Sequence, residues 1–339
     1  MAGTSRRLGV CLAVGLAVAG CATTPSAPPR PMPATELGRT PNAVIAVAQP
    51  GDTAASLAQR YLNDASLTRR VFPIGGETGL RAGDAVAIAL RPVDPGGTLG
   101  RSAQRVPILC YHRFTAQPKR RSRMDVTAAD FEAQLIYLRD NGYTVVSLKR
   151  LQAFLEGEGD LPAKPVVLTI DDGYRSAYTV ALPLLRKYGA PATLFVYSDF
   201  VGSGEALTWA QIAELEGSQL VDVQAHSKTH ADLTRRLNGE GEAAFQRRLA
   251  SEFAAPRDQM AARLGVRPTA FAYPYGAANA RVLSIARRSG WSMGLTVLRG
   301  GNPSWSDPML LRRDMVFGVD SLDTFARRLA AAEVAGRRP

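Results

Sequence analysis

Cysteine and histidine are scarce in this chain, which has only three of each among 339 residues. Three cysteines are too few for a framework of disulfide bonds, so a small disulfide-stabilised fold is excluded. Cys11 and Cys21 lie near the N-terminus, and Cys110 lies in a candidate strand, where a single buried thiol is expected. The length allows one large domain and a small one, and the 46% apolar composition is ample for a buried core.

The sequence also lacks a basic segment interleaved with aromatic residues. Lys and Arg number 41 against 30 Asp and Glu, a net charge of +11, yet the arginines are scattered along the chain. We therefore expect no nucleic-acid partner. A positive surface would suit anionic wall or membrane material, and a generally basic proteome would account for the same charge.

The N-terminal apolar run 8–19 is too short to span a bilayer as a mature helix. It follows the basic pair Arg6-Arg7 and ends in Val18-Ala19-Gly20-Cys21, which resembles a bacterial lipobox. By that resemblance, residues 1–20 are a lipoprotein signal peptide and Cys21 is the lipidated first residue of the mature protein. The alternative is an ordinary cleaved signal, or a signal anchor, with a chance cysteine.

Lipid chains on Cys21 would hold the protein at a membrane surface rather than through it. Ala22, not Asp, follows the cysteine. By resemblance to Gram-negative lipoproteins, this residue favours the outer membrane. In a Gram-negative host the expected location is therefore the cell envelope, on the periplasmic face of the outer membrane.

Two kinds of segment follow the leader. Residues 21–42 are rich in Pro, Ala, Ser and Thr, the composition of a tether. Residues 43–91 predict a small α+β module with a strand at Ala43–Val47, a helix from Thr53 and a strand at Ala85–Leu90. Residues 92–105 contain Gly and Pro and are expected to form a linker.

The layout of segment 43–91 resembles a LysM module, the small fold that binds glycans containing N-acetylglucosamine. The resemblance rests on the Pro50-Gly-Asp-Thr53 turn before the helix and on the late Leu80-x-x-Gly-x-x-Val-x-Ile88 pattern. It implies peptidoglycan as a partner. The usual Asn-rich stretch between helices is replaced by Phe72-Pro-Ile-Gly-Gly76, and a structural cap without ligand is the alternative.

From residue 106 the pattern changes to alternating strands and helices, which predicts an α/β domain with a parallel sheet or barrel over 106–339. Besides the apolar runs named below, candidate strands are Tyr143–Val146, Ala192–Tyr197, Ala270–Tyr273, Met293–Val297 and, more weakly, Leu310–Val316. Candidate helices are Ala128–Asn141, Ser176–Tyr188, Ala243–Leu264, Ala280–Ser289 and Ser321–Ala332.

All three histidines and the one Asp-Asp pair come after short apolar runs, directly or within one turn. These are His112, Asp171-Asp172 and His226, with His230 four residues further on; the runs are Val106–Tyr111, Val166–Ile170 and Leu220–Ala225. In a barrel of alternating strands and helices, the C-terminal strand ends converge on one rim. Two imidazoles and two carboxylates on that rim predict a bound divalent metal with an acid/base pair, and hence a hydrolase.

Each pattern also has a structural alternative. Adjacent carboxylates in Asp171-Asp172-Gly173 could be solvated turn residues, and an aromatic turn such as Phe271-Ala-Tyr-Pro-Tyr-Gly276 could simply pack. Imidazoles four residues apart, as at His226 and His230, can share one face of a helical turn and bind one metal, but such a pair also occurs by chance.

Together and in this order, the three motifs resemble the NodB-type polysaccharide deacetylases of carbohydrate esterase family 4, which have a distorted (β/α) barrel. By that resemblance Asp172, His226 and His230 are the metal ligands, Asp171 is the general base, and the backbone N–H of Tyr275 stabilises the oxyanion. Three ligands leave positions open for water and substrate. Zinc suits two His and one Asp, and cobalt or nickel would also fit.

One departure from the usual family concerns the general acid, because no histidine follows His230. The segment Tyr111-His112-Arg113 resembles the subgroup that includes the poly-β-1,6-N-acetylglucosamine deacetylases, in which an early histidine takes this role. The resemblance therefore implies His112 as the acid that protonates the leaving amine. A packed strand-end histidine is the alternative.

A second departure concerns the arginine that orients the base, since Ala270 and Ala272 flank Phe271 where the family commonly has it. Arg312 or Arg313, beside Asp314, could substitute, and ordinary surface charges are the alternative. The family places an apolar wall for the acetyl methyl group near Trp291; Leu295 could join it, Tyr273 is a further candidate substrate contact, and a core tryptophan is the alternative.

The resemblance implies a metal-dependent hydrolase that removes N-acetyl groups from a cell-surface polysaccharide containing N-acetylglucosamine, either exopolysaccharide or peptidoglycan. Two other functions stay open. The same site could cleave O-acetyl esters of a polysaccharide, and the barrel could be catalytically idle in a cell-wall-binding lipoprotein. The presence of ligands, base and acid together argues against an idle barrel.

Overall fold

The computed structural model describes residues 36–40, 43–74, 80–90, 104–117, 122–156, 159–304 and 306–333. The expected signal peptide, Cys21, most of the expected tether and most of the linker 92–105 lie outside these residues. No described helix is both long enough and apolar enough to cross a membrane.

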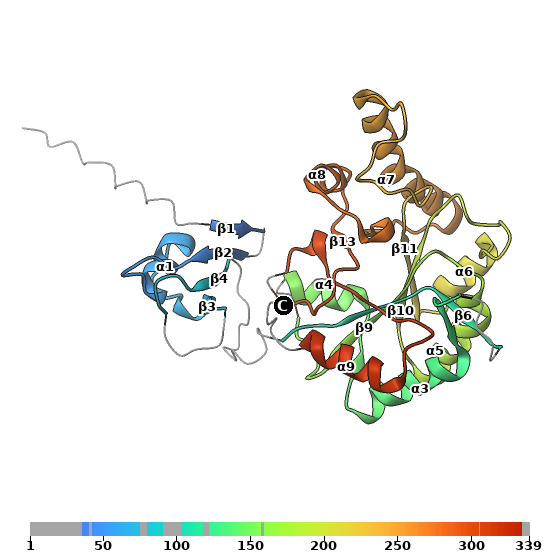
Figure 1. Cartoon of the computed structure of the whole chain (residues 1–339), viewed down its shortest axis with the longest axis horizontal. Helices are drawn as coiled ribbons and strands as arrows, with labels where there is room; N and C mark the ends of the chain where they lie inside the picture. Colours follow the sequence, from blue (N-terminus) through green and yellow to red (C-terminus); the bar gives the residue numbers. More distant parts are fainter. Residues whose placement is uncertain are drawn as a thin grey trace, which may run out of the picture. The chain divides into compact units, whose positions relative to one another are not determined.

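A four-stranded antiparallel sheet and one α-helix form the N-terminal module (Figure 1). The sheet order is β1-β2-β4-β3, with β1 at Glu36–Arg39, β2 at Ala43–Val47, β3 at Val71–Pro73 and β4 at Ala85–Ala89. Helix α1 (Ala54–Leu62) begins at a capping box, in which Thr53 and Ser56 each accept a hydrogen bond from the other's backbone N–H. Its buried Leu57 and Ala58 pack on the sheet.

The strands expected at 43–47 and 85–90 and the helix expected after Thr53 are confirmed within a residue. Strand β1 lies inside the segment that its composition assigns to a tether. All four of its residues are exposed, so no apolar alternation marks it in the sequence. Phe72 and Pro73 lie in β3, after the short 3₁₀ turn Thr68–Arg70, rather than between two helices.

The second part of the described chain is built on an eight-stranded sheet in which every pairing is parallel. Its order is β13-β12-β11-β10-β9-β5-β14, and β8 also pairs with β9. The strands are β5 (Ile108–Tyr111), β8 (Thr144–Val145), β9 (Pro165–Ile170), β10 (Ala192–Val196), β11 (Val221–Ala225), β12 (Ala270–Ala272), β13 (Met293–Leu295) and β14 (Asp314–Met315).

The two ends of this sheet approach each other. Leu295 of β13 forms a parallel bridge with Leu311, three residues before β14 at the other end of the sheet. The Thr296 amide also donates to the Leu311 carbonyl oxygen at 2.8 Å. The sheet is therefore curled into the distorted (β/α) barrel that the alternation of strands and helices predicts.

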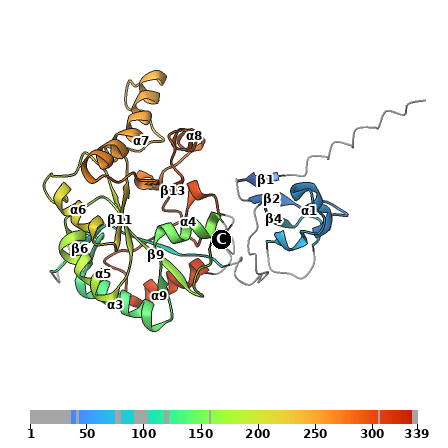
Figure 2. The same ribbon diagram turned by 180° about the vertical axis from the view of Figure 1, so that it is seen from behind.

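Helices cover the outside of the curled sheet (Figure 1), and the view from behind shows the same arrangement, with α3, α5 and α9 along one side and α7 and α8 at the other end (Figure 2). They are α3 (Ala128–Asp140), α5 (Leu182–Tyr188), α6 (Trp209–Gly217), α7 (Glu242–Leu264), α8 (Ala280–Arg288) and α9 (Leu322–Glu333), whereas α4 (Leu148–Glu156) packs its buried side chains on the interior residues of the barrel.

The bounds of most expected helices match those of the structure within two residues. Three differences concern helices and strands. The helix expected at 176–188 begins with a π-helical turn at Ala177–Ala181. The patterns considered above do not predict α4 or α6, nor the short parallel pair β6 (Arg113–Thr115) and β7 (Asp125–Thr127). The weak strand expected at 310–316 is reduced to β14, because a 3₁₀ turn capped by Asp307 occupies Pro308–Leu310.

Alternation along the strands divides the core into two layers. Val166, Leu168 and Ile170 of β9 pack in the cluster that contains the outer helices, whereas Val167 belongs to a second cluster with Phe195, Leu295 and side chains of α4. Since successive side chains of a strand point to opposite faces, the second cluster lies inside the curl. The odd-numbered positions of β9 therefore face the barrel interior.

Candidate active site

The alternation of side chains along three strands places Asp171, His112 and His226 on the inner side of the barrel, at its mouth. On β9, Val167 and Thr169 face inward, so Asp171 follows on the inner side just past the strand end. On β5, Ile108 is an interior residue while Leu109 and Tyr111 pack outward, so His112 also continues the inner face. His226 follows β11 by the same rule, because Val221, Val223 and Ala225 all pack outward.

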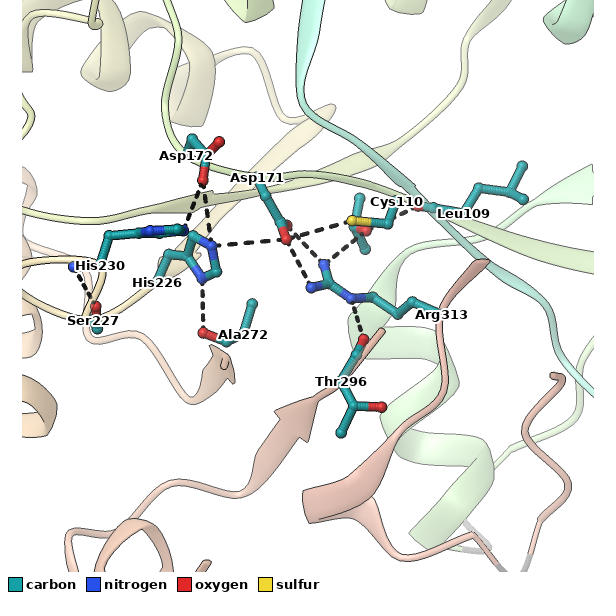
Figure 3. Close-up of polar contacts among 11 residues, drawn as sticks. Leu109, Cys110, Asp171, Asp172, His226, Ser227, His230, Ala272, Thr296 and Arg313 are labelled. Atoms are coloured by element: carbon teal, nitrogen blue, oxygen red, sulfur yellow. Dashed lines mark hydrogen bonds and ion pairs between the residues drawn. The ribbon is translucent and has the colours of Figure 1, made fainter. Parts of the chain in front are cut away.

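Asp172, His226 and His230 converge as the sequence predicts (Figure 3). The Asp172 Oδ1 atom lies 3.4 Å from His226 Nε2 and 3.3 Å from His230 Nε2. His226 Nδ1 lies 2.8 Å from the Ala272 carbonyl oxygen. As donor to that carbonyl, Nδ1 leaves the Nε2 lone pair facing Asp172, which is the tautomer that a metal ligand requires.

The donor set fits a divalent cation. Asp172 Oδ1 is buried and accepts no hydrogen bond of good geometry, although two imidazole nitrogens face it. Burial alone would raise the pKa of Asp172, but the two histidines beside it hold that pKa below its usual range. Two nitrogens and one carboxylate oxygen around a common point form a set that suits zinc.

The backbone around these ligands adopts rare conformations. Asp172, Ser227, His230 and Tyr275 have φ angles of 78°, 72°, 61° and 60°, in the left-handed region that non-glycine residues seldom occupy. They account for four of the six such non-glycine residues in the described ranges. Strain of this kind persists only where surrounding contacts hold it, and it concentrates at functional sites.

Glu252 supplies such contacts from α7 to the turn between the two histidines. Its Oε2 atom accepts hydrogen bonds from the Lys228 and Thr229 amides, each at 2.9 Å, and its Oε1 atom accepts one from Thr229 Oγ1 at 2.6 Å. Ser227 Oγ accepts a further bond from the His230 amide at 2.9 Å. The buried carboxylate of Glu252 therefore fixes the turn that presents His230.

Sequence reasoning missed Glu252, although a signal exists. It lies on the apolar stripe of its helix, three residues after the buried Leu249 and four before the buried Pro256. A lone acid on a buried stripe needs partners, so it marks a polar contact across the helix face.

Asp171 is held by Arg313, which resolves the choice between the two neighbouring arginines. The Arg313 guanidinium donates to both carboxylate oxygens of Asp171 at 2.7 Å, and its Nε donates to the Thr296 carbonyl oxygen at 2.9 Å. Arg313 is fully buried, whereas Arg312 reaches an exposed carbonyl of Arg299. Arg313 is thus the orienting arginine, and the surface-charge alternative holds only for Arg312.

This pair leaves Asp171 ionised. Burial raises the pKa of Asp171, but the Arg313 charge and the nearby His226 outweigh burial and lower it. Cys110, the buried thiol expected from the sequence, donates from Sγ to Asp171 Oδ2 at 3.4 Å. Burial raises the pKa of Cys110, so it serves as a neutral neighbour of the base.

His112 lies close to Asp171, with its ligand atom within 4.8 Å of those of Cys110 and Asp171. Its Nδ1 is buried and has no hydrogen-bond partner. Burial lowers the pKa of His112, while the carboxylates of Asp171 and Asp172 oppose that shift. A packed structural histidine would have its ring nitrogens paired, so this geometry favours a role toward substrate.

Tyr275 stands at the rim, in the turn after β12. Its ring packs at 4.8 Å from the His230 ring and is 66% exposed, and the turn is closed by the Gly276 amide on the Tyr273 carbonyl oxygen. The expected role of its backbone N–H in binding an oxyanion stays a prediction.

The three expected substrate contacts occupy the core instead of the mouth. Tyr273 follows Phe271 on the outer face of β12, and its hydroxyl donates to the Met309 carbonyl oxygen. Trp291 packs on Phe271 and under Arg257, as the core alternative has it. Leu295 faces inward but is fully buried in the interior cluster. A direct contact with substrate would require these side chains to leave the positions they occupy.

Comparisons with known proteins find polysaccharide deacetylases among the relatives of this chain. Residues 158–294 match the polysaccharide deacetylase family. YxkH of Bacillus subtilis, whose name gives polysaccharide deacetylase as its proposed activity, is 30% identical over 196 residues, covering 58% of this chain and 66% of YxkH. The poly-β-1,6-N-acetyl-D-glucosamine N-deacetylase of Escherichia coli is 25% identical over 260 residues, covering 66% of this chain and 38% of that protein.

A solved structure supports the same relationship. The Streptococcus pyogenes deacetylase PplD, in complex with acetate, superposes with a TM-score of 0.59 at 27% identity and covers 66% of this chain and 98% of its own. The curled parallel sheet, the family match and these relatives together show that the chain carries a polysaccharide deacetylase domain of the NodB type, which is the domain of a hydrolase.

Proposed function

We propose that this protein is a metal-dependent hydrolase that removes N-acetyl groups from a cell-surface polysaccharide containing N-acetylglucosamine. The observation that carries the proposal is the juxtaposition of two functional groups. A triad of metal-ligand type, Asp172, His226 and His230, lies beside a second carboxylate, Asp171, that a buried arginine keeps ionised. If the Asp171–Arg313 ion pair had only a structural role, it would not need the triad of metal-ligand type beside it.

Asp172, His226 and His230 would hold the metal, with zinc as the first candidate and cobalt or nickel as others. A divalent cation there would lower the pKa of the attacking water and polarise the acetamide carbonyl. Three protein ligands would leave coordination positions for water and substrate.

The chain's own residues would supply the proton transfers. Asp171, fixed by Arg313, accepts the proton of the attacking water as its oxygen bonds to the acetamide carbon. The Tyr275 N–H donates to the carbonyl oxygen as negative charge develops on it. His112 then gives a proton to the leaving nitrogen, the carbon–nitrogen bond breaks, and acetate and a free amine result.

Two relatives support the substrate class. The Escherichia coli relative is named for poly-β-1,6-N-acetyl-D-glucosamine, and PplD was solved with acetate, the product expected here. We propose an exopolysaccharide or peptidoglycan as the substrate, with the N-terminal LysM-like module as a peptidoglycan contact. Sedimentation with purified peptidoglycan should carry down the full chain but not a chain that lacks residues 36–90.

Acetate release tests the main proposal. The protein from residue 22 onward, loaded with zinc, is offered β-1,6- and β-1,4-linked N-acetylglucosamine oligomers and peptidoglycan, beside Asp171→Asn and the exposed control Asp323→Asn. We expect release that Asp171→Asn loses by at least about 100-fold and Asp323→Asn retains. Release only from a chromogenic acetate ester would instead support an O-acetyl esterase. No release with metal bound would support a binding lipoprotein.

A further inference from the structure

A cavity lies between the segments that follow β5 and β9 and the loop that carries Glu205. Its volume is about 240 Å³, below the roughly 300–1,000 Å³ of pockets for drug-sized ligands, so it suits a single sugar ring rather than a chain. It is lined by Arg113, Phe114, Thr115, Gln117, Asp125, Tyr174, Arg175, Ser176, Thr179 and Glu205.

The chain path joins this cavity to the site. Arg113 directly follows His112, and Tyr174 follows Asp172 after one glycine. Both segments enter the cavity wall as soon as they leave the catalytic strand ends. The wall of the cavity therefore begins one residue after His112 and two residues after Asp172.

The polar groups of the cavity are balanced in charge. Arg113 pairs with Asp125 at 3.1 Å and with Glu205 at 2.6 Å, and Arg175 donates to the Gly204 carbonyl oxygen at 2.7 Å. Two guanidiniums beside two carboxylates give no net preference for an ionic ligand. They do offer both donors and acceptors, which is what a neutral sugar with several hydroxyl groups requires.

Aromatic rings form a continuous path from the triad to this cavity. Tyr275 and Tyr197 flank His230 with ring centroids at 4.8 and 5.1 Å, Phe200 stacks on Tyr197 at 4.9 Å, and Tyr174 meets Phe200 edge-on at 5.3 Å. Such rings offer large apolar faces with a polar tip. The C–H faces of pyranose rings bind to surfaces of this kind.

Backbone contacts make this wall rigid. The loop 197–207 is tied to the metal-ligand turn by the Asp199 amide on the Lys228 carbonyl oxygen, at 2.9 Å, and by the Lys228–Asp199 ion pair at 2.6 Å. Two backbone hydrogen bonds join it to the segment after β9. The Arg175 amide donates to the Glu205 carbonyl oxygen, and the Leu207 amide donates to the Gly173 carbonyl oxygen. A preformed wall loses little conformational entropy when a ligand binds.

We propose that the Tyr174–Glu205 cavity is a subsite for the neutral hexosamine unit next to the one whose acetyl group is removed, reached along the path of aromatic rings. This inference rests on the proposed function and extends it from a reacting acetamide to a glycan of at least two units. The Arg113–Glu205 pair contacts the hydroxyl groups of that unit, and the Tyr174 ring contacts its apolar face.

The test compares substrates with and without a neighbouring sugar. Glu205→Ala and Tyr174→Leu are measured on N-acetylglucosamine oligomers of one to five units and on a chromogenic acetate ester. The controls are Asp323→Ala and Tyr178→Leu, which change an exposed acid and a tyrosine outside the cavity. We expect each cavity variant to lower kcat/KM for the pentamer about tenfold more than for the ester, mainly through KM, whereas the controls follow the wild type.

The outcomes separate the two proposals. A wild-type protein that releases acetate from oligomers, with cavity variants that lose equally on pentamer and ester or lose nothing, overturns the subsite but leaves the deacetylase. A zinc-loaded wild type that releases no acetate from any oligomer overturns both. Should Tyr174→Leu fail to fold, the exposed Glu205 still decides the question, since its side chain contributes nothing to the core.

Discussion

At the scale of single residues, the site depends on how a few buried charges are paired. Asp171 is only 2% exposed, and an isolated carboxylate at such a position would become neutral. Arg313 prevents this with two hydrogen bonds of 2.7 Å, so Asp171 stays ionised and can act as the proposed base. The pair is important for chemistry and stability alike, because removing one partner leaves the other buried and uncompensated.

Replacing Arg313 by Met should therefore shift the pH profile. Without the guanidinium, burial acts alone and raises the pKa of Asp171. The base must be ionised, so the acid limb of the kcat/KM profile moves to higher pH, and we expect the free energy of unfolding to fall by about 3–5 kcal/mol. Arg312→Met, one residue away and exposed, is the matched control. An acid limb that does not move in the folded Arg313→Met protein contradicts the prediction.

The Asp171–Arg313 pair also makes the stability of the folded protein depend on pH. The folded-state pKa of Asp171 is lower than its usual value, so the pair stabilises the protein above the unfolded-state pKa of the carboxyl. That contribution is lost as the pH falls through the depressed folded-state value.

His112 can be tested through the leaving group. A general acid matters for an amine, which must be protonated to leave, and matters less for a nitrophenolate, which leaves as the anion. We expect His112→Gln to lower amide hydrolysis about 10²–10⁴-fold and hydrolysis of a nitrophenyl acetate ester far less. Equal losses on both substrates would instead give His112 a structural or metal-related role. Because burial lowers the pKa of His112, the alkaline limb of the wild-type profile should begin below the usual value for histidine.

At the scale of elements, helix α7 acts on the metal site without providing a ligand. Glu252 contacts only the turn at 228–229, but that turn carries His230, whose φ angle is 61°. The turn holds this conformation because the buried carboxylate satisfies two amides and a hydroxyl at once. Strand parity places His226, the left-handed turn after β9 places Asp172, and the helix places His230.

Removal of Glu252 should therefore weaken metal binding. Glu252→Ala leaves the two amides unpaired and frees the turn, so we expect zinc affinity, measured by chelator competition, to fall about 10–100-fold, as for other groups that orient metal ligands. Glu252→Gln keeps one acceptor oxygen and should restore part of the affinity. Asp258→Asn, an exposed acid on the same helix, is the control. Zinc affinity equal to that of the wild type in both Glu252 variants would contradict this prediction.

At the scale of the whole molecule, we propose attachment to the cell envelope. The lipobox-like segment ending at Cys21 would place lipid chains at the start of the mature protein, and two or more chains hold a protein stably at a membrane surface. In a Gram-negative host, Cys21→Ser should move the protein from the membrane fraction to the soluble fraction, and mass spectrometry should find the lipid mass only on the wild type. Cys110→Ser is the control, and equal fractionation of both variants would rule out the anchor.

Local sequence was enough to predict the residues that sit at strand ends. Asp171, His112 and His226 each come directly after an apolar run that forms a strand, and parity in a parallel sheet brings such positions together. Asp172, one residue further on, reaches the same site through its left-handed backbone conformation. The spacing of His226 and His230 is likewise local, and the structure confirms that both face Asp172.

Contacts between distant segments decided the rest. Arg313 meets Asp171 across 142 positions of sequence, because β14 pairs with β5, the neighbour of β9 in the sheet. The sequence pattern does not distinguish Arg313 from Arg312, because which of the two faces the barrel interior depends on where β14 begins. Tyr273 packs outward in the helical layer, because the face of a short strand is set by its neighbours in the sheet, and Trp291, which precedes β13, packs in the same layer. The sequence by itself determined which groups could do the chemistry; the tertiary structure decided which arginine holds the base, which helix holds the ligand turn, and which aromatic residues face the mouth of the barrel.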